Sequence, residues 1–287
     1  MQDYEKVSRY AYASAVTAAR TDRVRIGVQL GLQHASFAQI RDAVLRFEEL
    51  GVDTIFVSDH FFPVGPAAEG FQFEVWMTLA SIAELTHRVE FGPLVSSTAY
   101  RNPDLQADMA RTIDHISAHA TGVGRFIFGT GSGGQERDFR AYGYPFDGPA
   151  ARAERLASDV ARVRERWAAL NPPPTRSIPL LIGGHGENTT LRTVAEHADI
   201  WHSFSDPDTF VRRLGVVRHW CAEIGRDPRE IRLATGTSLG GAGMLDAASL
   251  RAYHALGVRL FVPALDGPEF DLAPVRRLLD WRETLEV

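Results

Sequence analysis

The sequence is almost devoid of two reactive residue types. Cys221 is the only cysteine among 287 residues, and Lys6 is the only lysine, so that arginine supplies nearly all of the positive charge. A single cysteine can form no internal disulfide and cannot build a cysteine-rich metal site, which fits a reducing, cytoplasmic setting. Schiff-base or general-base chemistry through lysine is disfavoured as well, because Lys6 lies in the N-terminal segment.

The chain also lacks a strong excess of charge and long apolar runs. Its formal net charge is -5, and it contains no dense run of basic residues, which argues against nucleic acids and membrane surfaces as partners. Residues 1–23 carry charges throughout and are predicted to form an N-terminal extension rather than a signal peptide or a membrane span. Hydrophobic residues make up 45% and charged residues 23%, as in ordinary globular proteins.

Eight short apolar segments recur from Val24 onward, each with the length and composition of a buried strand. Segments with helical spacing separate them, and this alternation predicts a parallel sheet covered by helices. We therefore expect an α/β fold, a single (β/α)8 TIM barrel over residues 24–287. An open, doubly wound sheet is the alternative, but the loop after the first strand lacks the G-x-G-x-x-G pattern. The eight segments are 24–30, 53–58, 89–95, 125–130, 178–183, 199–203, 231–237 and 258–265.

The ends of two predicted helices are marked in the sequence. Ser36 and Gln39 form a capping-box pattern at the start of the first helix, and Gly51 follows its last apolar residue. In the helix after the third strand, Asp104 is the expected N-cap. These signals place the loops, and therefore the strand ends, with some accuracy.

Polar side chains follow several strands at the points where the strands end. Asp59 and His60 follow the second strand, Ser96 follows the third, and His202 closes the sixth. Because the active sites of such barrels lie at the carboxyl ends of the strands, we expect these side chains to converge on one rim. His60 can exchange a proton near neutral pH. The alternative is a structural pair, in which the acid caps a turn and the imidazole bonds to a carbonyl.

Two glycine-rich stretches follow the fourth and fifth strands. Residues 129–134 (GTGSGG) bring bare backbone to the rim, where a flat ring can pack against the main chain, although an ordinary turn explains them equally well. Residues 183–187 (GGHGE) precede a helix expected to begin near Asn188 or Thr189. The N–H groups at such a helix start suit a phosphate, and a plain tight loop is the alternative.

A metal centre is a rival interpretation of the same residues. The ligands would be Asp59, His60, His185 and His202, which come from four strand ends. The sequence contains no H-x-H or H-E-x-x-H pair, so such a site would depend entirely on how the chain folds. A metal-dependent barrel hydrolase is therefore kept as an alternative function.

Four motifs, in order along the chain, resemble those of the luciferase-like flavin and deazaflavin oxidoreductases, and more closely the branch that uses coenzyme F420. The resemblance runs from about Val24 to the C-terminus. It implies a (β/α)8 barrel that holds the coenzyme ring in its mouth and transfers a hydride to or from a small-molecule substrate. The motifs are SDHFFP (58–63), GPLVSSTAYRNPDLQADMARTIDHIS (92–117), GRFIFGTGSG (124–133) and IPLLIGGHGENTTLRTVAEHADIWHS (178–203).

The resemblance also implies roles for individual residues. His60 would donate or accept the proton, with Asp59 beside it at the ring, and two phenylalanines, Phe61 and Phe62, would shield the transfer from water. Residues 92–96 would form a bulge behind the ring, which in this family often contains a non-prolyl cis peptide. The coenzyme contacts implied are Asp59, Leu94, Val95, Ser96, Gly131 and Ser132 around the ring, and Gly183, Gly184, His185, Gly186 and Glu187 along the phosphate-bearing tail.

The sequence departs from the family pattern in three places. Residues 118–123 form an insertion before the fourth strand that can reshape the rim. Gly134 stands where relatives often carry Trp or Glu, and Glu136 is a candidate replacement for the missing acid. Arginine would have to take the place of the tail-binding lysines.

Several functions remain open at this point. An F420-dependent oxidoreductase is the leading expectation, and an FMN-dependent monooxygenase on the same barrel is the alternative. A non-catalytic F420-binding protein is also possible, in view of Gly134 and the insertion. The resemblance further implies a homodimer, for which Trp76 and Met77, expected to be exposed on the second helix, would suit the interface.

Overall fold

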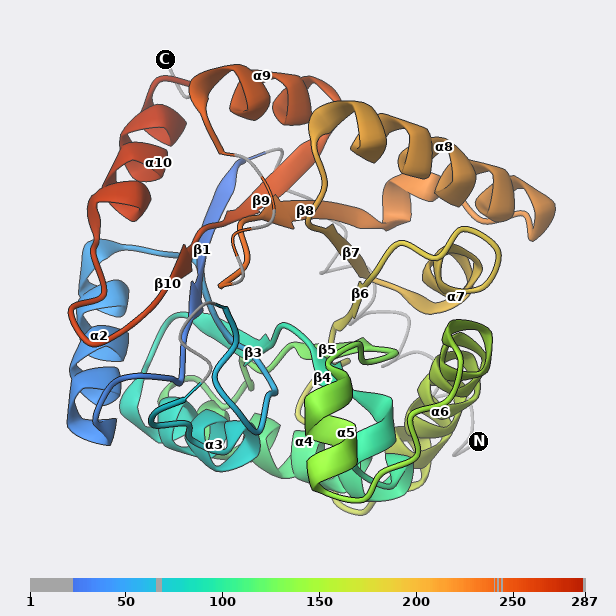
Figure 1. Cartoon of the computed structure of the whole chain (residues 1–287), viewed down its shortest axis with the longest axis horizontal. Coiled ribbons are helices and arrows are strands. Elements are labelled where there is room, and N and C mark those ends of the chain that lie inside the picture. Colours follow the sequence, from blue (N-terminus) through green and yellow to red (C-terminus); the bar gives the residue numbers. More distant parts are fainter. Residues whose placement is uncertain (1–22, 66–68, 240, 242, 244, 286–287) are drawn as a thin grey trace, which may run out of the picture.

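The computed structural model describes residues 23–65, 69–239, 241, 243 and 245–285. This part of the chain forms a ring of parallel strands surrounded by helices, so the predicted (β/α)8 barrel is confirmed (Figure 1). Apart from Arg23, the expected N-terminal extension lies outside the described residues. None of the helices in the described part is both long enough and apolar enough to span a membrane.

The described strands pair in the order β3-β2-β1-β9-β8-β7-β6-β5-β4, and every pair is parallel. β3 and β4 are consecutive pieces of one barrel strand, as are β9 and β10, so ten pieces make the eight predicted strands. The ring closes where Phe91 bridges Phe126. The bounds are β1 Arg25–Leu30, β2 Thr54–Val57, β3 Glu90–Pro93, β4 Ser96–Ser97, β5 Phe128–Gly131, β6 Leu180–Gly183, β7 Ile200–Ser203, β8 Arg232–Gly236, β9 Val258–Val262 and β10 Ala264–Leu265.

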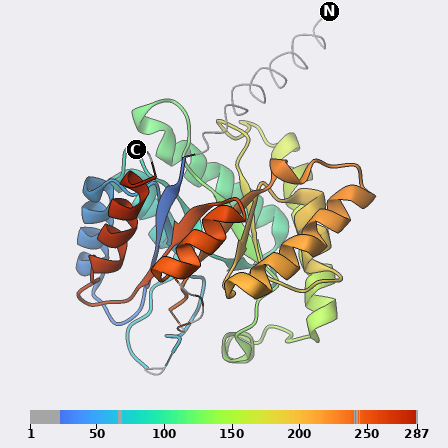
Figure 2. The same cartoon turned by 90° about the horizontal axis from the view of Figure 1, so that it is seen from above.

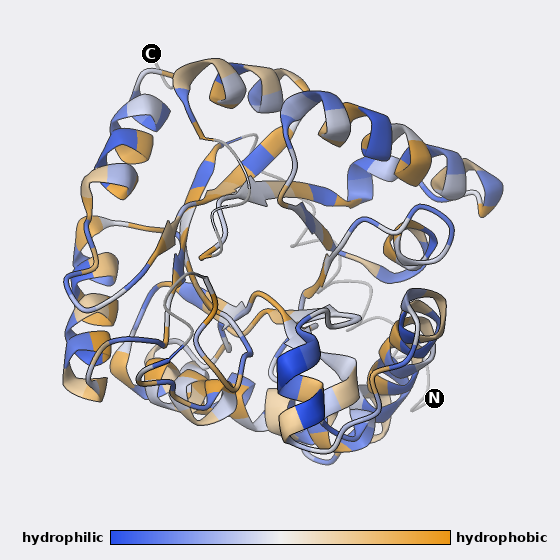
Figure 3. Ribbon diagram, viewed as in Figure 1, coloured by the Kyte–Doolittle hydropathy of each residue, from blue (hydrophilic) through white to orange (hydrophobic). Residues whose placement is uncertain are grey.

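Helices follow the strands around the outside of the ring (Figure 1). One short additional helix, α5, precedes α6, and three 3-10 turns connect other elements. The outer helices cover the strands from outside, and most strand residues are buried, although Figure 3 shows polar residues among the apolar ones. The bounds are α2 Phe37–Leu50, α3 Val75–Leu85, α4 Pro103–Ser117, α5 Glu136–Ala141, α6 Pro149–Ala169, α7 Thr190–His197, α8 Pro207–Glu223, α9 Ala247–Ala255, α10 Ala273–Glu283, η1 Thr98–Tyr100, η2 Ala118–Ala120 and η3 Pro228–Glu230.

The predicted ends of α2 are confirmed. The Ser36 hydroxyl accepts a hydrogen bond from the Gln39 N–H, and the Gln39 side chain accepts one from the Ser36 N–H at 2.9 Å. Gly51 ends the helix in the left-handed conformation, with φ of 92°. The capping box and the glycine stop therefore position the start and end of this helix as the sequence indicates.

The expected N-cap of α4 is wrong by two residues. The Asn102 side chain, not Asp104, accepts the hydrogen bonds of the first turn, from the N–H groups of Asp104 and Leu105. Pro103 occupies the first helical position, where its missing N–H costs nothing, and this moves the cap to the preceding residue. Asp104 instead forms an ion pair with Arg162 of α6.

Residues 118–123 lie at the opposite end of the barrel from the strand ends expected to carry the chemistry. They connect the end of α4 to the start of β5, and the loops that precede parallel strands gather at the amino end. His119 Nε2 lies 3.2 Å from the Thr86 carbonyl oxygen, which ties the segment to the end of α3. Figure 2 shows the barrel from the side, with the loop between α4 and β5 at one end and α5 at the other. The expectation that this insertion reshapes the rim is therefore wrong.

Two apolar clusters fill the fold. The larger lies between the strands and the helices, and the smaller fills the inside of the barrel. Trp76 belongs to the larger cluster and is only 1% exposed, so its predicted exposure is wrong. It packs against Phe126 and Phe128, whereas its neighbour Met77 is 69% exposed, as expected. The inner cluster consists of Phe56, Leu94, Ile127, Leu181, Ile200, Ala234, Leu260 and Val262.

Arg125 is a buried arginine that holds the end of α3 against the start of the strands. Its guanidinium donates hydrogen bonds to the carbonyl oxygens of Ala83, Thr86, Val89 and Ser117, and to the Thr86 hydroxyl. The carbonyl groups at the end of a helix lack partners within the helix, and Arg125 supplies them. Burial lowers the pKa of this guanidinium relative to its ordinary value.

We expect Arg125→Ala to lower the free energy of unfolding by about 3 kcal/mol, because several buried acceptors lose their donor at once. Urea unfolding followed by circular dichroism would measure this loss. Arg41→Ala, at a side chain that is 53% exposed, is the matched control and should stay within about 0.5 kcal/mol of wild type. A loss below about 1 kcal/mol for Arg125→Ala would show that these contacts do not hold the helix end.

His202 of β7 points into the barrel interior. It is 1% exposed and stands two residues from Ile200 of the inner cluster, with its ring 4.4 Å from that of Phe204. Its Nε2 atom has no hydrogen-bond partner among the described residues. Burial lowers the pKa of His202 to about 3, so that the folded protein holds the imidazole in its neutral form.

This buried imidazole predicts a loss of stability in acid. Between pH 6.5 and 3 the unfolded chain binds a proton at His202 that the folded chain does not, so stability falls as the pH falls. From pH 7 to pH 5 the loss due to His202 should be about 2 kcal/mol. Urea unfolding of wild type and His202→Gln at both pH values would measure it as the difference between the two losses. The control His219→Gln, at an exposed position, should keep the wild-type loss, and equal losses in all three proteins would refute the prediction.

Candidate active site

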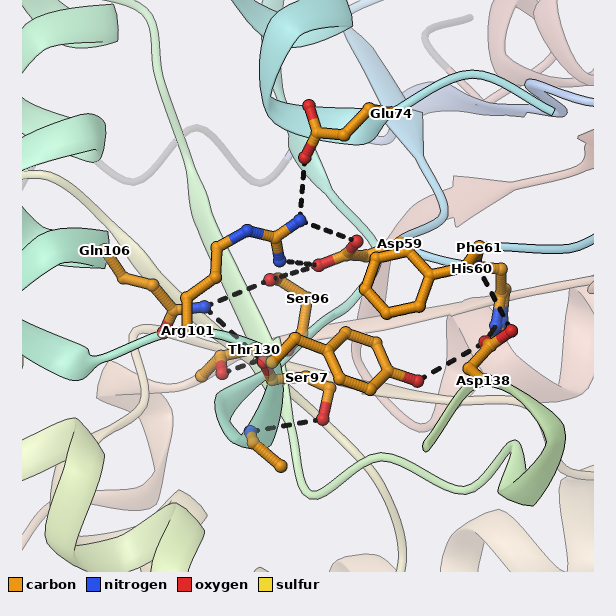
Figure 4. Close-up of polar contacts among 12 residues, drawn as sticks. Asp59, His60, Phe61, Glu74, Ser96, Ser97, Arg101, Gln106, Thr130 and Asp138 are labelled. Atoms are coloured by element: carbon orange, nitrogen blue, oxygen red, sulfur yellow. Dashed lines mark hydrogen bonds and ion pairs between the residues drawn. The ribbon is translucent and has the colours of Figure 1, made fainter. Parts of the chain in front are cut away.

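Asp59 lies at the carboxyl end of β2, in a network of buried hydrogen bonds (Figure 4). The Arg101 guanidinium donates to both of its carboxylate oxygens, at 2.6 Å and 3.3 Å, and the Ser96 hydroxyl donates to Oδ2 at 2.6 Å. Burial raises the pKa of the Asp59 carboxyl, while Arg101 and Ser96 act in the opposite direction. The side chain is thus fixed in place by three donors.

Arg101 links this acid to a second one. Its Nη2 atom donates to Glu74 at 2.7 Å, and Glu74 in turn caps α3 by accepting from the Met77 N–H. Burial lowers the pKa of Arg101, but Asp59 and Glu74 outweigh this effect and keep the pKa above its ordinary value. The loop after β4 is thereby joined to the end of β2 and to the start of α3.

His60 follows Asp59 in the chain but belongs to a different set of contacts. Its Nδ1 atom lies 2.8 Å from Oδ2 of Asp138, which comes from α5 (Figure 4). The Tyr100 hydroxyl donates to the same oxygen at 3.3 Å, and the Phe61 N–H donates to Oδ1 at 3.3 Å. The His60 side chain is 30% exposed, whereas Asp138 is fully buried. The imidazole is therefore anchored on one side and open on the other.

Aromatic rings cluster around the two phenylalanines that follow His60 in the chain. Phe61 stacks on Tyr142 with ring centroids 4.0 Å apart, and its centroid lies 4.7 Å from that of Tyr100. Phe62 lies under the guanidinium of Arg137 at 4.2 Å. Such rings supply a large apolar surface next to the polar residues, which is typical of a small-molecule site.

The peptide bond between Leu94 and Val95 is cis and separates β3 from β4. It lies within residues 92–96, where the family resemblance implies such a bond. The Gln29 side chain donates to the Leu94 carbonyl oxygen at 2.8 Å and so holds the bulge from inside the barrel. A Cβ on Gly131 or on Gly183 would come within 2.8 Å of the Val95 side chain, so both positions require glycine.

The glycine-rich loop 183–187 leads from β6 into α7, which begins at Thr190, one residue beyond the expected start. Gly184 adopts φ of 139°, and the Trp201 indole donates to its carbonyl oxygen at 3.0 Å. Glu187 forms an ion pair with Arg212 of α8. Thr189 makes no side-chain capping bond, and the Leu191 N–H in the first turn of α7 donates instead to the Gly186 carbonyl oxygen at 2.9 Å.

The structure brings some of the predicted residues together and separates others. Asp59 and Ser96 share a network, and Val95, Gly131 and Gly183 pack against one another, whereas His60 turns to α5. The loop residues Gly184, His185, Gly186 and Glu187 form a separate group in front of α7. Ser132 follows β5 directly and is partly buried.

Glu136 does not contact His60. Its side chain forms an ion pair with Arg140 one turn further along α5, and it is half exposed. A Cβ on Gly134 would meet nothing within 4 Å, so the space near this position is open. The acid that contacts the imidazole is Asp138, two residues after Glu136.

The sequence interpretation missed Asp138 and the part played by Arg101. Asp138 and Phe139 are the buried residues of α5, and an acid on the buried face of a short helix is the one signal that marks Asp138. Six residues are too few for a periodic pattern to reveal that face. Arg101 is one of several polar residues that follow the third strand, and nothing in the sequence marks it as the partner of Asp59.

The four ligands of the metal alternative do not form a cluster. In the described residues there is no group of three or more His, Cys, Asp or Glu side chains that could hold a metal ion. Asp59 is occupied by Arg101 and Ser96, and His60 by Asp138. The geometry therefore gives the metal-dependent hydrolase no support.

Comparison with known proteins gives relatives at low identity. The chain is 28% identical over 150 residues to an F420-dependent glucose-6-phosphate dehydrogenase of Amycolatopsis mediterranei, which covers 52% of this chain and 43% of that protein. It is 31% identical over 148 residues to the enzyme of the same name from Intrasporangium calvum, covering 50% and 42%. The match thus spans less than half the length of either relative.

Among solved structures, an F420-dependent secondary alcohol dehydrogenase in complex with an F420-acetone adduct superposes with a TM-score of 0.75. The superposition covers 87% of this chain and 96% of that one at 15% identity, and at this identity it supports the fold alone. Residues 21–254 match the family described as luciferase-like monooxygenase. The chain therefore belongs to the luciferase-like monooxygenase family.

Proposed function

We propose that the protein is an oxidoreductase that transfers a hydride between coenzyme F420 and a small organic substrate, with His60 as proton donor or acceptor. The observation that supports the proposal is the position of the His60 imidazole. It is bonded to Asp138 on one side and exposed on the other, and it lies near the buried ion pair of Asp59 and Arg101 at the carboxyl end of the barrel. Two relatives named as F420-dependent dehydrogenases support the choice of coenzyme. A cytoplasmic setting and a single catalytic barrel over residues 24–287 are part of the proposal.

The residues of the barrel mouth fit a flat ring with polar edges. Two buried, inward-facing polar atoms lack a partner among the described residues, His202 Nε2 and Gln29 Oε1. A buried polar atom without a partner costs free energy that a bound polar group recovers. In the proposal the ring packs on the bulge at Leu94 and Val95, beside Ser96, Gly131 and Ser132.

The loop before α7 fits a phosphate-bearing tail. Arg213 of α8 lies near His185 of this loop. Partial burial and the positive charge of Arg213 both lower the pKa of His185. The Arg213 Nε atom is buried without a partner among the described residues. The start of α7, which has no side-chain cap, adds the positive end of the helix dipole. We assign Gly183, Gly184, His185, Gly186 and Glu187 to this end of the coenzyme.

The bound deazaflavin ring supplies the hydride acceptor or donor. The chain itself supplies the rest of the chemistry. The Nε2 atom of His60, on the open side of the imidazole, takes or returns the substrate proton. In this scheme Asp59 faces the deazaflavin ring, and Arg101 and Ser96 hold its carboxylate in place. Phe61, with its stacked neighbour Tyr142, excludes water from the transfer. Glu136, paired with Arg140, has no direct part in this scheme.

Titration of the purified protein with coenzyme F420 and with FMN, followed by fluorescence quenching, tests the proposal. We expect F420 to bind with micromolar or tighter affinity and FMN to bind more weakly. Arg213→Gln should weaken F420 binding about 10- to 100-fold, because a charge-assisted contact to phosphate is lost. The control Arg218→Gln changes an exposed arginine of the same helix and should bind as wild type does.

The other outcomes distinguish the alternatives. Tighter binding of FMN would favour a flavin-dependent monooxygenase, and no binding of either coenzyme would refute the proposal. If Arg213→Gln and wild type bound F420 with equal affinity, F420 would remain the coenzyme, but its tail would not contact α8. Tight F420 binding combined with activity that survives the loss of His60 would exclude the proton role of that residue.

We further propose that the protein forms a homodimer through the face that carries Phe71 and Met77. These side chains are 65% and 69% exposed, and Phe71 lies in the loop leading to α3. They flank Glu74, the N-cap of α3, and large exposed apolar side chains on one segment are typical of an interface. Sedimentation velocity at micromolar concentration should show a dimer.

We expect the double variant Phe71→Glu and Met77→Glu to sediment as a monomer, because the symmetric partner would bring the new carboxylates together in an apolar contact. Val211→Glu is the control, since this residue of α8 is also exposed, at 45%. It should remain dimeric. A monomeric wild-type protein, or a dimeric double variant, would contradict the proposed interface.

A further inference from the structure

We propose that Asp138 is a positioning residue that holds His60 in one tautomer, with the proton on Nδ1 and the lone pair on Nε2. The inference rests on the proposed function, in which His60 exchanges a proton with the substrate. Its basis is the 2.8 Å contact between His60 Nδ1 and Oδ2 of Asp138, whose side chain is fully buried. At this distance one of the two atoms must carry a hydrogen.

The surroundings of Asp138 decide which atom carries it. The Phe61 N–H donates to Oδ1, and the Tyr100 hydroxyl donates to Oδ2. Burial and the nearby Asp138 charge raise the pKa of Tyr100, so its hydroxyl keeps its hydrogen. Donors thus face both oxygens, as an ionised carboxylate requires, and the hydrogen of the remaining contact belongs to His60 Nδ1.

A proton on Nδ1 fixes what the other ring nitrogen can do. In neutral imidazole one nitrogen donates and the other accepts, so Nε2 presents a lone pair on the open side of the ring. In substrate oxidation the O–H bond of an alcohol breaks and its proton moves to Nε2. A bound F420 ring would accept the hydride from the adjacent carbon as the C=O bond forms. In substrate reduction the proton and the hydride would move in the opposite direction.

Because of the position of α5, the acid that contacts the His60 imidazole is the buried Asp138 and not one of its neighbours. Glu136, on the same helix, is turned to Arg140, and Gln72 contacts only the backbone carbonyl oxygen of His60. Asp138 is therefore the carboxylate bonded to the imidazole ring, and Asp59 next in the chain is bound to Arg101 instead. Substitution of Asp138 should change the tautomer without removing the network around Asp59.

The tautomer can be read directly from the 15N resonances of the histidine rings, and no substrate is needed. The protein is labelled with 15N in its histidines and examined at about pH 8.5, above the ordinary pKa of histidine. His60→Gln identifies the His60 signals by their absence. We expect the Nδ1–H form to exceed the Nε2–H form at least about 10-fold in wild type, because a charge-assisted bond selects it.

Asp138→Asn should reverse this preference. The Phe61 N–H holds the carboxamide oxygen at the Oδ1 position, so the NH2 group faces His60 Nδ1 and the hydrogen moves to Nε2. The control Asp147→Asn changes a carboxylate that is 43% exposed and paired with Arg155, and it should keep the wild-type spectrum. A purely structural role for Asp138 would not move the hydrogen between the two ring nitrogens.

Two results would overturn the proposal. One is a predominant Nε2–H form in wild type, which needs no variant to fold. The other is an unchanged tautomer in folded Asp138→Asn. F420 binding by the wild-type protein is measured separately, so a failure of the proposed function shows as lost coenzyme binding while the tautomer result stands independently.

Discussion

The site depends on the buried contact between Asp59 and Arg101. Taking both charges out of water is costly, and the cost is offset only because the carboxylate accepts three hydrogen bonds while the guanidinium also reaches Glu74. Removal of either partner would leave a buried charge alone. The pair joins the end of β2, the loop after β4 and the start of α3, so it fixes the backbone from which His60 projects.

At the amino end of the barrel, acidic side chains have a structural role. Asp53 precedes β2 and accepts from the Ile26 N–H of β1, and Asp199 precedes β7 and accepts from the Leu180 N–H of β6, each at 2.8 Å. Glu90 lies between Arg25 and Arg176, which lower its pKa in spite of burial that would raise it. These acids bond across neighbouring strands and stabilise the ring. At the carboxyl end, in contrast, the acids Asp59 and Asp138 lie in the candidate active site, where Asp138 contacts the His60 imidazole.

The strands could be predicted from the sequence because a strand covered on both faces is mostly apolar, and this signal does not depend on distant contacts. The cap of α2 was equally local. The cap of α4 was not, because Pro103 decided it, and the burial of Trp76 depended on Phe126 and Phe128 from other strands. Asp59 and His60 were found from their place after a strand, but their separate partners arise only when the barrel closes.

The choice of Glu136 over Asp138 shows what decides a side chain's role in such a rim. Gly133 takes φ of 73°, and a Cβ there would come within 2.5 Å of the Ser97 hydroxyl oxygen and 2.8 Å of the Phe139 ring. Only glycine permits this turn at the start of α5. The turn buries Phe139 and with it Asp138, whereas Glu136 lies on the exposed side of the helix. Because Asp138 lies on the buried face of α5, it reaches the imidazole, and in a helix of six residues that face cannot be recognised from the sequence pattern.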